Sequence, residues 1–362
     1  MIPYGRQSVD EDDIAAVVDV LRGDWLTQGP SIERFEEAVA QYVGAKFAVA
    51  YSSGTSALHG AAAAAGLGPG DVVATSPLTF MASANAARFV GAQPMLVDIC
   101  KHTWNINMSA VPQEVRAVIP VHYAGLPVDL SRTKSNRQII IEDAAHALGA
   151  LTPDGPVGNC AHSDMCCFSF HPVKPITTGE GGMVTTNDPD LAERLRQFRS
   201  HGIVRKPEQG AWHYEISSLG YNYRMTDIQA ALGVSQMNKL EKFMTRRNEI
   251  ANRYRELLSN TPIGLPPAAP NGFRHGYHLF PVLVENRRAV FDGMRDANIG
   301  VQVHYVPIHH HPISQDIRQS ATDLPVCEDV YERLVSLPIH PTLTNDDQDF
   351  VVKTLLSTQS KR

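Results

Sequence analysis

The sequence predicts an α/β fold in which a mostly parallel sheet is covered by helices on both faces. Between residues 46 and 170, short apolar segments with strand character alternate with helical segments, a pattern typical of βαβ units. These strands are apolar almost throughout, as expected for strands that are buried on both faces. After about residue 225 the pattern changes and predicts a smaller α+β domain.

Two amphipathic helices are predicted ahead of the first strand. Residues 8–23 begin with acidic side chains and end at Gly23, whereas residues 31–44 begin at Ser31, the expected N-cap, and end at Gly44. Acidic side chains favour a helix N-terminus, and glycine is common just beyond a helix C-terminus.

Strands and helices then alternate along the chain. Residues 52–67 pass from a loop into an alanine-rich helix, and residues 81–90 form another helix. The predicted strands are 46–51, 71–76, 93–99, 116–123, 137–148 (with a polar end) and 164–170.

The last third of the chain has a different organisation. Residues 225–258 form one long helical pattern, and a proline-rich surface connection follows at 260–272. We therefore expect a large domain over residues 1–240 and a small domain over 241–362, bridged by the long helix near 226–258. Within the small domain, strands are predicted at 277–284 and 301–305 and helices near 287–297 and 345–358.

The composition argues against several classes of function. The 362 residues carry a net charge of −6 and the 32 basic residues are scattered, whereas nucleic-acid binding needs a basic surface. No segment approaches the roughly 20 apolar residues of a membrane-spanning helix, and the N-terminus has no signal-peptide pattern. Five cysteines without paired spacing predict reduced thiols in a cytoplasmic protein. A metal cluster of Cys160, Cys166, Cys167 and His162 is considered, but residues 164–170 alternate like a buried strand, so no metal is expected.

Residues 52–56, SSGTS, lie between a predicted strand and a helix start. Small residues there let backbone N–H groups approach an anion, the hydroxyls of Thr55 and Ser56 add hydrogen bonds, and the helix dipole favours negative charge. The stretch has neither a P-loop lysine nor the dinucleotide-binding glycine pattern. Taken alone, it fits either a phosphate site or a plain N-capped helix start.

Asp143 follows three consecutive isoleucines, so its carboxylate is expected to emerge from a desolvated strand. A buried carboxylate is costly unless a cation or a protonated ring nitrogen meets it. In isolation Asp143 equally fits the N-cap of a following short helix. His146, three positions later, either hydrogen-bonds near the same site or is a structural polar residue.

Lys174 lies beyond the predicted strand that carries Ser169, between two prolines and before the turn 177–182. A lysine that reacts as an amine must be partly desolvated. A phosphate site, a buried acid and such a lysine in this order describe a site for pyridoxal 5′-phosphate (PLP), in which the acid pairs with the pyridinium nitrogen and the lysine forms the Schiff base. Phe80, at another strand-to-helix passage, either stacks on the pyridine ring or packs in the core.

With these residues in place, the sequence resembles the nucleotide-sugar aminotransferases of the DegT/DnrJ/EryC1/StrS family. The resemblance covers nearly the whole chain, from WLTQGPSIERFE and SSGTSAL through EDAAHALGA and FSFHPVKPITTGEGG to GYNYRMTDIQAALG and SLPIHP. It implies fold type I of the PLP-dependent transferases, the aspartate aminotransferase fold, with a mostly parallel sheet of the seven-stranded type in the large domain.

Carried over residue by residue, the resemblance implies Lys174 as the Schiff-base lysine and Asp143 as the partner of the pyridinium nitrogen. Asn222 would reach the phosphate of the neighbouring subunit's cofactor, so that a homodimer shares its two sites. The other implied cofactor contacts are Gly54, Thr55, Ser56 and Ser169 around the phosphate and Phe80 and His146 at the ring. The implied substrate-lining residues are Tyr4, Asp24, Trp25, Leu26, Thr27, Gln302, His304 and Tyr305.

Within that family, the segments HPVKPITTGEGG and VQVHYVPI are similar to those of the aminotransferase of pseudaminic acid biosynthesis. The similarity implies transfer of an amino group from L-glutamate, through pyridoxamine 5′-phosphate (PMP), to C4 of a UDP-linked 4-keto-6-deoxy-2-acetamido sugar. Another dTDP-, GDP- or UDP-linked keto sugar, aminated at C3 or C4, stays open, as does a non-catalytic sugar-nucleotide regulator. The related sugar 3-dehydratases carry histidine in place of Lys174. Arg224 is a candidate for binding the glutamate carboxylates, and residues 309–311 are expected to form a polar loop rather than a metal site.

Overall fold

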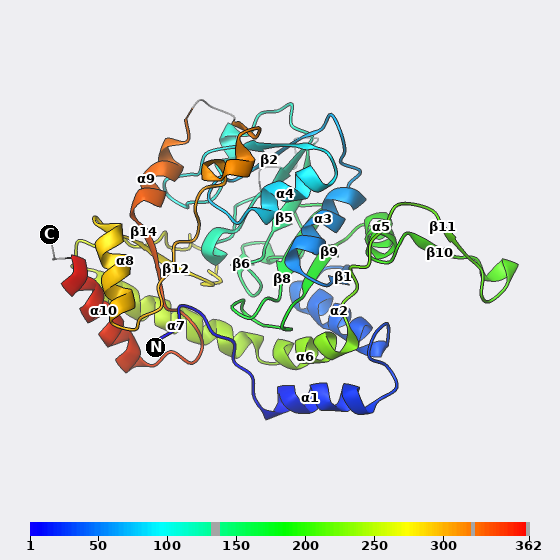
Figure 1. Ribbon diagram of the computed structural model, residues 1–362, viewed down its shortest axis with the longest axis horizontal. Coiled ribbons are helices and arrows are strands. Elements are labelled where there is room, and N and C mark those ends of the chain that lie inside the picture. The colour runs from blue at the N-terminus through cyan, green and yellow to red at the C-terminus, as the bar shows by residue number, and fades with distance from the viewer. Residues whose placement is uncertain (132–137, 320–322, 360–362) are drawn as a thin grey trace.

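The computed structural model describes the chain except for residues 132–137, 320–322 and 360–362 (Figure 1). Its centre is an eight-stranded sheet in the order β1-β9-β8-β5-β4-β2-β3-β13. Neighbouring strands run parallel except at β9, which is antiparallel to both β1 and β8. The strands are β1 Phe47–Tyr51, β2 Val72–Thr75, β3 Gln93–Leu96, β4 Ala117–Ile119, β5 Ile139–Asp143, β8 Met165–Ser169, β9 Gly182–Thr186 and β13 Arg318–Gln319.

Helices connect the first three strands in the sequence. After β1 the chain returns through α3 (Gly54–Ala64), and after β2 it returns through α4 (Ala82–Phe89). The predicted alternation of strands and helices is therefore confirmed from β1 to β3. The first residue of the predicted strand 137–148 lies outside the described residues. Two strands of this sheet, β9 and β13, are absent from the prediction: β9 directly follows a glycine-rich turn, and β13 has only two residues.

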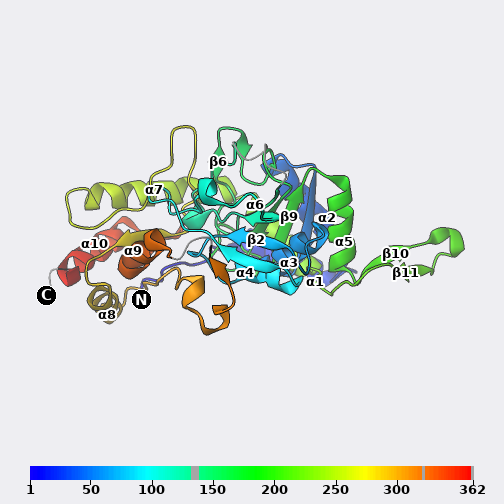
Figure 2. The ribbon, with the colours of Figure 1, turned by 90° about the horizontal axis from the view of Figure 1, so that it is seen from above.

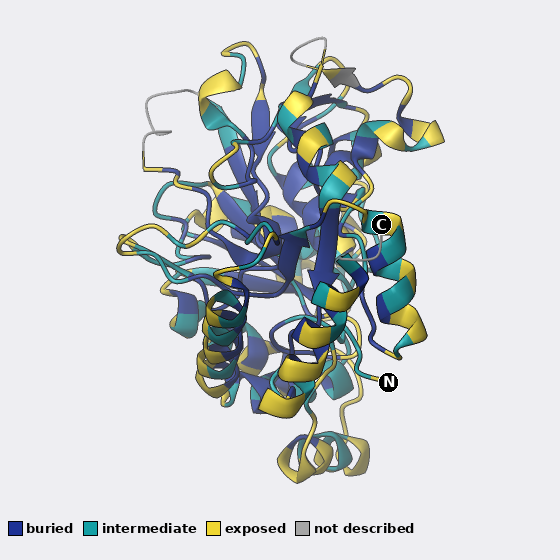
Figure 3. Cartoon of the chain, turned by 90° about the vertical axis from the view of Figure 1, so that its left-hand side faces the viewer, coloured by how far each residue is buried: buried dark blue, intermediate teal, exposed yellow. Residues whose placement is uncertain are grey.

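Helices cover both faces of the sheet (Figure 2). On one face, α3, α4 and α5 (Pro189–Arg199) pack over an alanine- and valine-rich core that includes Ala61 and Val184. On the other face, α2 (Pro30–Val43) and α6 (Asp227–Met237) pack over Phe35, Phe168 and Phe170, and α1 (Glu11–Arg22) packs outside α6. Figure 3 shows the strands buried between these layers.

The prediction that Ser31 caps the second helix is wrong. The helix begins at Pro30, Gly29 is its N-cap, and Ser31 lies inside its first turn. Proline suits this first position because it has no N–H group to satisfy. The capping acceptor comes from a distant element: the carboxylate of Asp227 accepts hydrogen bonds from the Gly29 N–H at 2.8 Å and the Ser31 N–H at 2.9 Å.

The single helix predicted over residues 225–258 is also wrong, because α6 ends at Met237 and α7 (Leu240–Leu258) begins afresh. At the break, the Lys239 N–H donates to the Gln236 carbonyl, three residues earlier, which tightens the turn. The Lys239 ammonium is held by Asp10 and Asp13 of the N-terminal segment. Apolar periodicity continues across the break, so the sequence pattern does not reveal it.

The C-terminal part has a core of its own. Two antiparallel strands pack with the helices around apolar side chains that include Tyr254, Phe280 and Leu355. A further cluster joins Leu96 of β3 and Leu78, which follows β2, to Leu334 of β14, so apolar contact continues between the two parts. Division of the chain near residue 240 stays a prediction. The elements are β12 Phe280–Leu283, β14 Leu334–Leu337, α8 Arg287–Asp296, α9 Pro325–Arg333 and α10 Asn345–Gln359.

Residues 301–305 do not form the predicted strand. Gln302 makes an isolated antiparallel bridge with Ser336. Beyond it the His304 carbonyl accepts a hydrogen bond from the Tyr123 hydroxyl at 2.5 Å. A side chain therefore uses a backbone group that a strand ladder would need, and the segment turns toward the large sheet instead of continuing along β14.

Two short hairpins complete the fold: β6 (Leu151–Thr152) with β7 (Gly155–Pro156), and β10 (Ile203–Arg205) with β11 (Tyr214–Ile216). The second hairpin, residues 203–216, is called the arm because it extends away from the body of the molecule (Figures 1 and 2). Trp212 in the arm and Leu219 beside it are 80% and 78% exposed. Among the helices of the described residues, none is long and apolar enough to cross a membrane.

Candidate active site

A cavity of about 410 Å³ opens where β1, β5 and β8 end at their carboxyl sides. In an α/β sheet, such strand ends gather side chains from distant parts of the chain. A larger cleft of about 670 Å³ between α2, α5 and residues 224–225 contains neither Lys174 nor Asp143. Ten residues predicted from the sequence line the 410 Å³ cavity: Tyr4, Gly54, Thr55, Phe80, Asp143, His146, Ser169, Lys174, His304 and Tyr305.

The turn from β1 into α3, together with Ser169 at the end of β8, forms what we call the phosphate cup. Ser53 is the N-cap of α3 and accepts a hydrogen bond from the Ser56 N–H at 3.1 Å. The first N–H groups of a helix have no partner inside it, which leaves those of Gly54 and Thr55 available to an anion. A Cβ on Gly54 would lie 2.8 Å from the Cβ of Ser169, so glycine is required for this close approach.

Ser56 lies beneath the cup rather than in it. Its side chain is buried, and its hydroxyl donates to the Ser53 carbonyl at 2.8 Å and accepts from the Ser53 N–H at 2.9 Å. These contacts complete a capping box that fixes the start of α3. Contact between Ser56 and a phosphate stays a prediction.

Asp143 is the last residue of β5, and its buried side chain lines the cavity. One carboxylate oxygen accepts a hydrogen bond from the Ser83 hydroxyl at 2.7 Å, and the other accepts from the Ala145 N–H at 3.2 Å. Ser83, on α4, is a residue that the sequence prediction misses. Its only signal is its place one helical turn after Phe80, in the same strand-to-helix passage.

Lys174 lies in the connection between β8 and β9, with its backbone N–H donating to the His171 carbonyl at 2.9 Å. Lys174 is partly buried and lines the cavity. This burial lowers the pKa of Lys174 to about 8, and the nearby Asp143 carboxylate acts in the opposite direction. The neutral amine is thus accessible at moderate pH, as a nucleophile or base requires.

Three imidazoles surround Lys174: those of His146, His278 and His304. Burial and the Lys174 ammonium hold the pKa values of His146 and His278 well below their usual range, and the same causes lower the pKa of His304 to about 4. The His146 ring lies 4.4 Å from that of His278, and its Nε2 lies 3.0 Å from the Tyr305 hydroxyl. His278 was not predicted, because it sits in the distant, otherwise apolar stretch YHLF without a recognisable motif.

Phe80 is 59% exposed, in contrast with a residue that packs in the core. Its ring lines the cavity and lies 6.0 Å from the ring of Tyr305. An exposed ring at a cavity wall is available to stack on a flat ligand. This geometry favours the ring-stacking prediction over core packing.

Besides Ser56, six predicted site residues do not line this cavity within one chain: Asn222, Asp24, Trp25, Leu26, Thr27 and Gln302. Thr27 forms a bridge with Thr226, and the Asp227 N–H donates to the Leu26 carbonyl at 3.0 Å. The segment 24–27 and the segment that carries Asn222 therefore lie together. Arg224, the candidate for the glutamate carboxylates, lines the larger cleft instead.

The cysteines considered as metal ligands are buried thiols. Cys166 and Cys167 are neighbours on β8, so their side chains point to opposite faces of the sheet. His162 pairs with Asp154 at 2.8 Å. Over the described part of the chain, one group of possible metal ligands is found, namely His309 and His310 on the Glu328 carboxylate.

Comparison with known proteins identifies the family of this chain. The model of the DegT/DnrJ/EryC1/StrS aminotransferase family matches residues 7–356. The chain belongs to this family. It is 36% identical to the UDP-4-amino-4,6-dideoxy-N-acetyl-beta-L-altrosamine transaminase of Campylobacter jejuni, with 100% of this chain and 98% of the relative covered. It is 37% identical to the spore coat polysaccharide biosynthesis protein SpsC of Bacillus subtilis, covering 97% and 95% of the two chains.

Solved structures agree with this assignment. The sugar aminotransferase Spr1654 of Streptococcus pneumoniae, in its PMP form, superposes with a TM-score of 0.94 over 100% of both chains at 28% identity. Helicobacter pylori PseC, an aminotransferase of pseudaminic acid biosynthesis, has a TM-score of 0.92 over 100% of both chains at 30% identity. The predicted fold type I is confirmed, and the protein is a PLP-dependent sugar aminotransferase.

The residues of the cavity fit PLP. Gly54 and Ser169 lie close together in the phosphate cup. The same cavity contains the acid Asp143 and Lys174, and burial lowers the pKa of Lys174. The Nδ1 atoms of His146 and His278 are buried without a hydrogen-bond partner. Unpartnered buried nitrogen atoms are costly, so a polar ligand at this place offsets their cost.

Proposed function

We propose that this aminotransferase moves an amino group from L-glutamate to the C4 keto group of a UDP-linked 4-keto-6-deoxy-2-acetamido sugar. The catalytic part of the proposal rests on one observation: Lys174 and Asp143 lie in the same cavity, where the pKa of Lys174 is lowered to about 8. The choice of sugar is supported by the functions of the Campylobacter transaminase and of PseC. We also propose a cytoplasmic location, supported by five free cysteines.

Bound PLP supplies an electron sink that stabilises a carbanion beside its ring. The Asp143 carboxylate, anchored by Ser83, would keep the ring nitrogen protonated. Lys174 would attach the cofactor and, once released, carry a proton between the α-carbon of the donor and the C4′ carbon of the cofactor. Gly54, Thr55 and Ser169 would retain the phosphate while Lys174 is free.

A different nucleotide-linked keto sugar is the second candidate. The spore coat relative has an identity similar to that of the Campylobacter transaminase, so overall identity does not favour one sugar pathway. Loops read the base and the position of the keto group, and loops vary most between relatives. Amination at C3, or a dTDP- or GDP-linked acceptor, is therefore the alternative.

We further propose that the enzyme is a homodimer with two shared sites. Asn222 lies at the base of the exposed arm, in a bridge with Ser200, and does not line the cavity of its own chain. The exposed Trp212 and Leu219 offer apolar surface for a second copy. In such a dimer Asn222 would reach the partner's phosphate cup.

The substrate is tested by incubating the purified protein with PLP, L-glutamate and a panel of UDP-, dTDP- and GDP-linked keto sugars. Mass spectrometry of the products and NMR of the aminated carbon identify the acceptor and the position. The expected product is the 4-amino sugar from the UDP-linked 2-acetamido substrate. Faster turnover of a dTDP- or GDP-linked sugar, or amination at C3, would contradict the proposal.

A further inference from the structure

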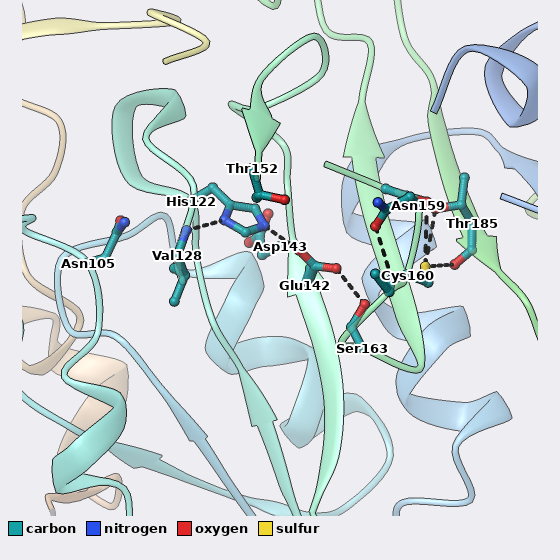
Figure 4. Close-up of polar contacts among 12 residues, drawn as sticks. Asn105, His122, Val128, Glu142, Asp143, Thr152, Asn159, Cys160, Ser163 and Thr185 are labelled. Atoms are coloured by element: carbon teal, nitrogen blue, oxygen red, sulfur yellow. Dashed lines mark hydrogen bonds and ion pairs between the residues drawn. The ribbon is translucent and has the colours of Figure 1, made fainter. Parts of the chain in front are cut away.

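Glu142 is a buried carboxylate directly before Asp143 on β5. Because successive strand residues point to opposite faces, Glu142 does not line the active-site cavity but a separate cavity of about 160 Å³. One oxygen of Glu142 lies 2.8 Å from Nε2 of His122, and the other accepts from the Ser163 hydroxyl at 2.5 Å, as Figure 4 shows. The reaction proposed above uses none of these three groups.

The contacts of His122 define its protonation. Its Nδ1 accepts a hydrogen bond from the Val128 N–H at 2.9 Å, so Nδ1 carries a lone pair. The single ring proton must then lie on Nε2 and point at Glu142. His122 is fully buried and neutral in this arrangement, so it bonds the Glu142 carboxylate without cancelling its charge.

The described residues that line this cavity beside Glu142 include no lysine or arginine. Ser163 is a neutral donor, and the 160 Å³ cavity is also lined by Asp129, Asp154 and His162. His162 is paired with Asp154 at 2.8 Å. Among the described residues, no lysine or arginine forms an ion pair with Glu142.

The backbone connects this cluster to Asp143. The His122 N–H donates to the Asp143 carbonyl at 3.1 Å, and the Asp143 N–H donates to the Pro120 carbonyl at 2.9 Å. On the other side, the Ala144 N–H donates to the Cys167 carbonyl at 2.9 Å. Glu142 therefore ties the end of β5 to the end of β4 and, through Ser163, to the segment before β8.

We propose that Glu142, held by His122 and Ser163, is a positioning residue that fixes Asp143 at the strand end and adds negative charge favouring a protonated ring nitrogen in the cofactor. The inference rests on the proposed role of Asp143. Two carboxylates on adjacent buried residues act on the same cation, and charges interact strongly where water is excluded. Removing one of them weakens the affinity of the ring nitrogen for its proton.

The test uses Glu142→Gln in the full-length enzyme loaded with isotope-labelled PLP, whose ring-nitrogen chemical shift reports its protonation by NMR. Glutamine keeps both contacts, because its oxygen accepts from His122 and its amide donates to Ser163. The pH at which the ring nitrogen loses its proton is expected to fall by about one unit, a tenfold change in its acidity. An unchanged titration in the folded Glu142→Gln enzyme would overturn the proposal.

Ser163→Ala is the matched control, since it removes one hydrogen bond to Glu142 and keeps the charge. It is expected to lower thermal stability while leaving the ring-nitrogen titration close to that of the parent enzyme; an equal shift in both variants would contradict a role for the charge. If Glu142→Gln does not fold, Thr152→Lys places a cation beside Glu142 in the same cavity and must produce the same fall.

Asp143→Asn, measured in parallel, distinguishes the role of Asp143 from that of Glu142. A titration unchanged in Asp143→Asn contradicts the proposed role of Asp143. A titration that moves in Asp143→Asn but not in Glu142→Gln contradicts only the role of Glu142.

Discussion

Lys174 and Asp143 face the same cavity, and the Asp143 carboxylate affects the protonation of Lys174. Burial favours the neutral amine of Lys174, whereas the carboxylate favours its ammonium form. The net result is a pKa of about 8, below the ordinary lysine value of 10.5. In the proposed complex with PLP, the Asp143 carboxylate would face the protonated ring nitrogen while Lys174 is bonded to the cofactor.

This pKa predicts how PLP attaches to the apo-protein. Only the neutral amine attacks the aldehyde, so the attachment rate is expected to rise with pH and to reach half its maximum near pH 8. Stopped-flow absorbance of the apo-protein mixed with PLP measures the profile. A half-maximum near pH 10 would show that the lysine is not desolvated in solution.

Replacing the lysine gives a second prediction. Lys174→Ala is expected to lose the visible absorbance of covalently attached PLP and to lose turnover by several orders of magnitude, since both the attachment and the base are removed. Lys242→Ala, at an exposed lysine on α7, is the control and should keep both. Normal turnover in Lys174→Ala would exclude the assignment.

At the scale of single residues, the sequence is informative where a short motif carries the chemistry. The cup, Asp143 and Lys174 each follow a strand, and parallel strands bring such residues to one edge. Ser83 and His278 could not be recognised, because each acts through a contact with a residue far away in the sequence, Asp143 or His146. Their roles exist only in the folded chain.

At the scale of elements, α2 and α6 depend on one carboxylate. Asp227 is fully buried and accepts the N–H groups of Gly29 and Ser31. Asp227→Ala leaves these donors without partners and is expected to lower the free energy of unfolding by about 1–3 kcal/mol. Urea denaturation measures the loss. Asp190→Ala, at an exposed position in the first turn of α5, should change it by less than about 0.5 kcal/mol.

Element boundaries are the part of the fold that sequence patterns predicted least well. The break between α6 and α7 is fixed by ion pairs from Lys239 to Asp10 and Asp13, and residues 301–305 leave the small sheet because Tyr123 binds the His304 carbonyl. Both causes are tertiary contacts. Periodicity reports which residues are buried but carries no information about such contacts.

At the scale of the whole molecule, the shared-site dimer predicts complementation between inactive subunits. A mixture of Lys174→Ala and Asn222→Ala chains would form heterodimers in which one site has both native residues. Activity of the mixture, after unfolding and refolding together, is expected to exceed the mean of the two separate variants. If each chain builds its site alone, mixing will restore nothing.

The same dimer predicts that the apolar residues at the arm are needed for assembly. Replacing Trp212 and Leu219 by serine removes the exposed apolar surface and is expected to shift the protein toward monomer in sedimentation velocity experiments. Cofactor retention should fall together with the dimer. Phe350→Ser, at an apolar residue of α10 that is 46% exposed, should leave both unchanged.

The antiparallel strand β9 helps to determine where Lys174 lies. Ser169 and Gly182 face each other across one rung of the β8–β9 ladder, and Gly182 is paired on its other side with Tyr51. The lysine therefore belongs to a closed loop whose two ends meet at the sheet, beside the cup. Loop length then becomes a functional quantity: one extra residue between positions 170 and 181 would carry the amine away from the ring even if every catalytic side chain were retained.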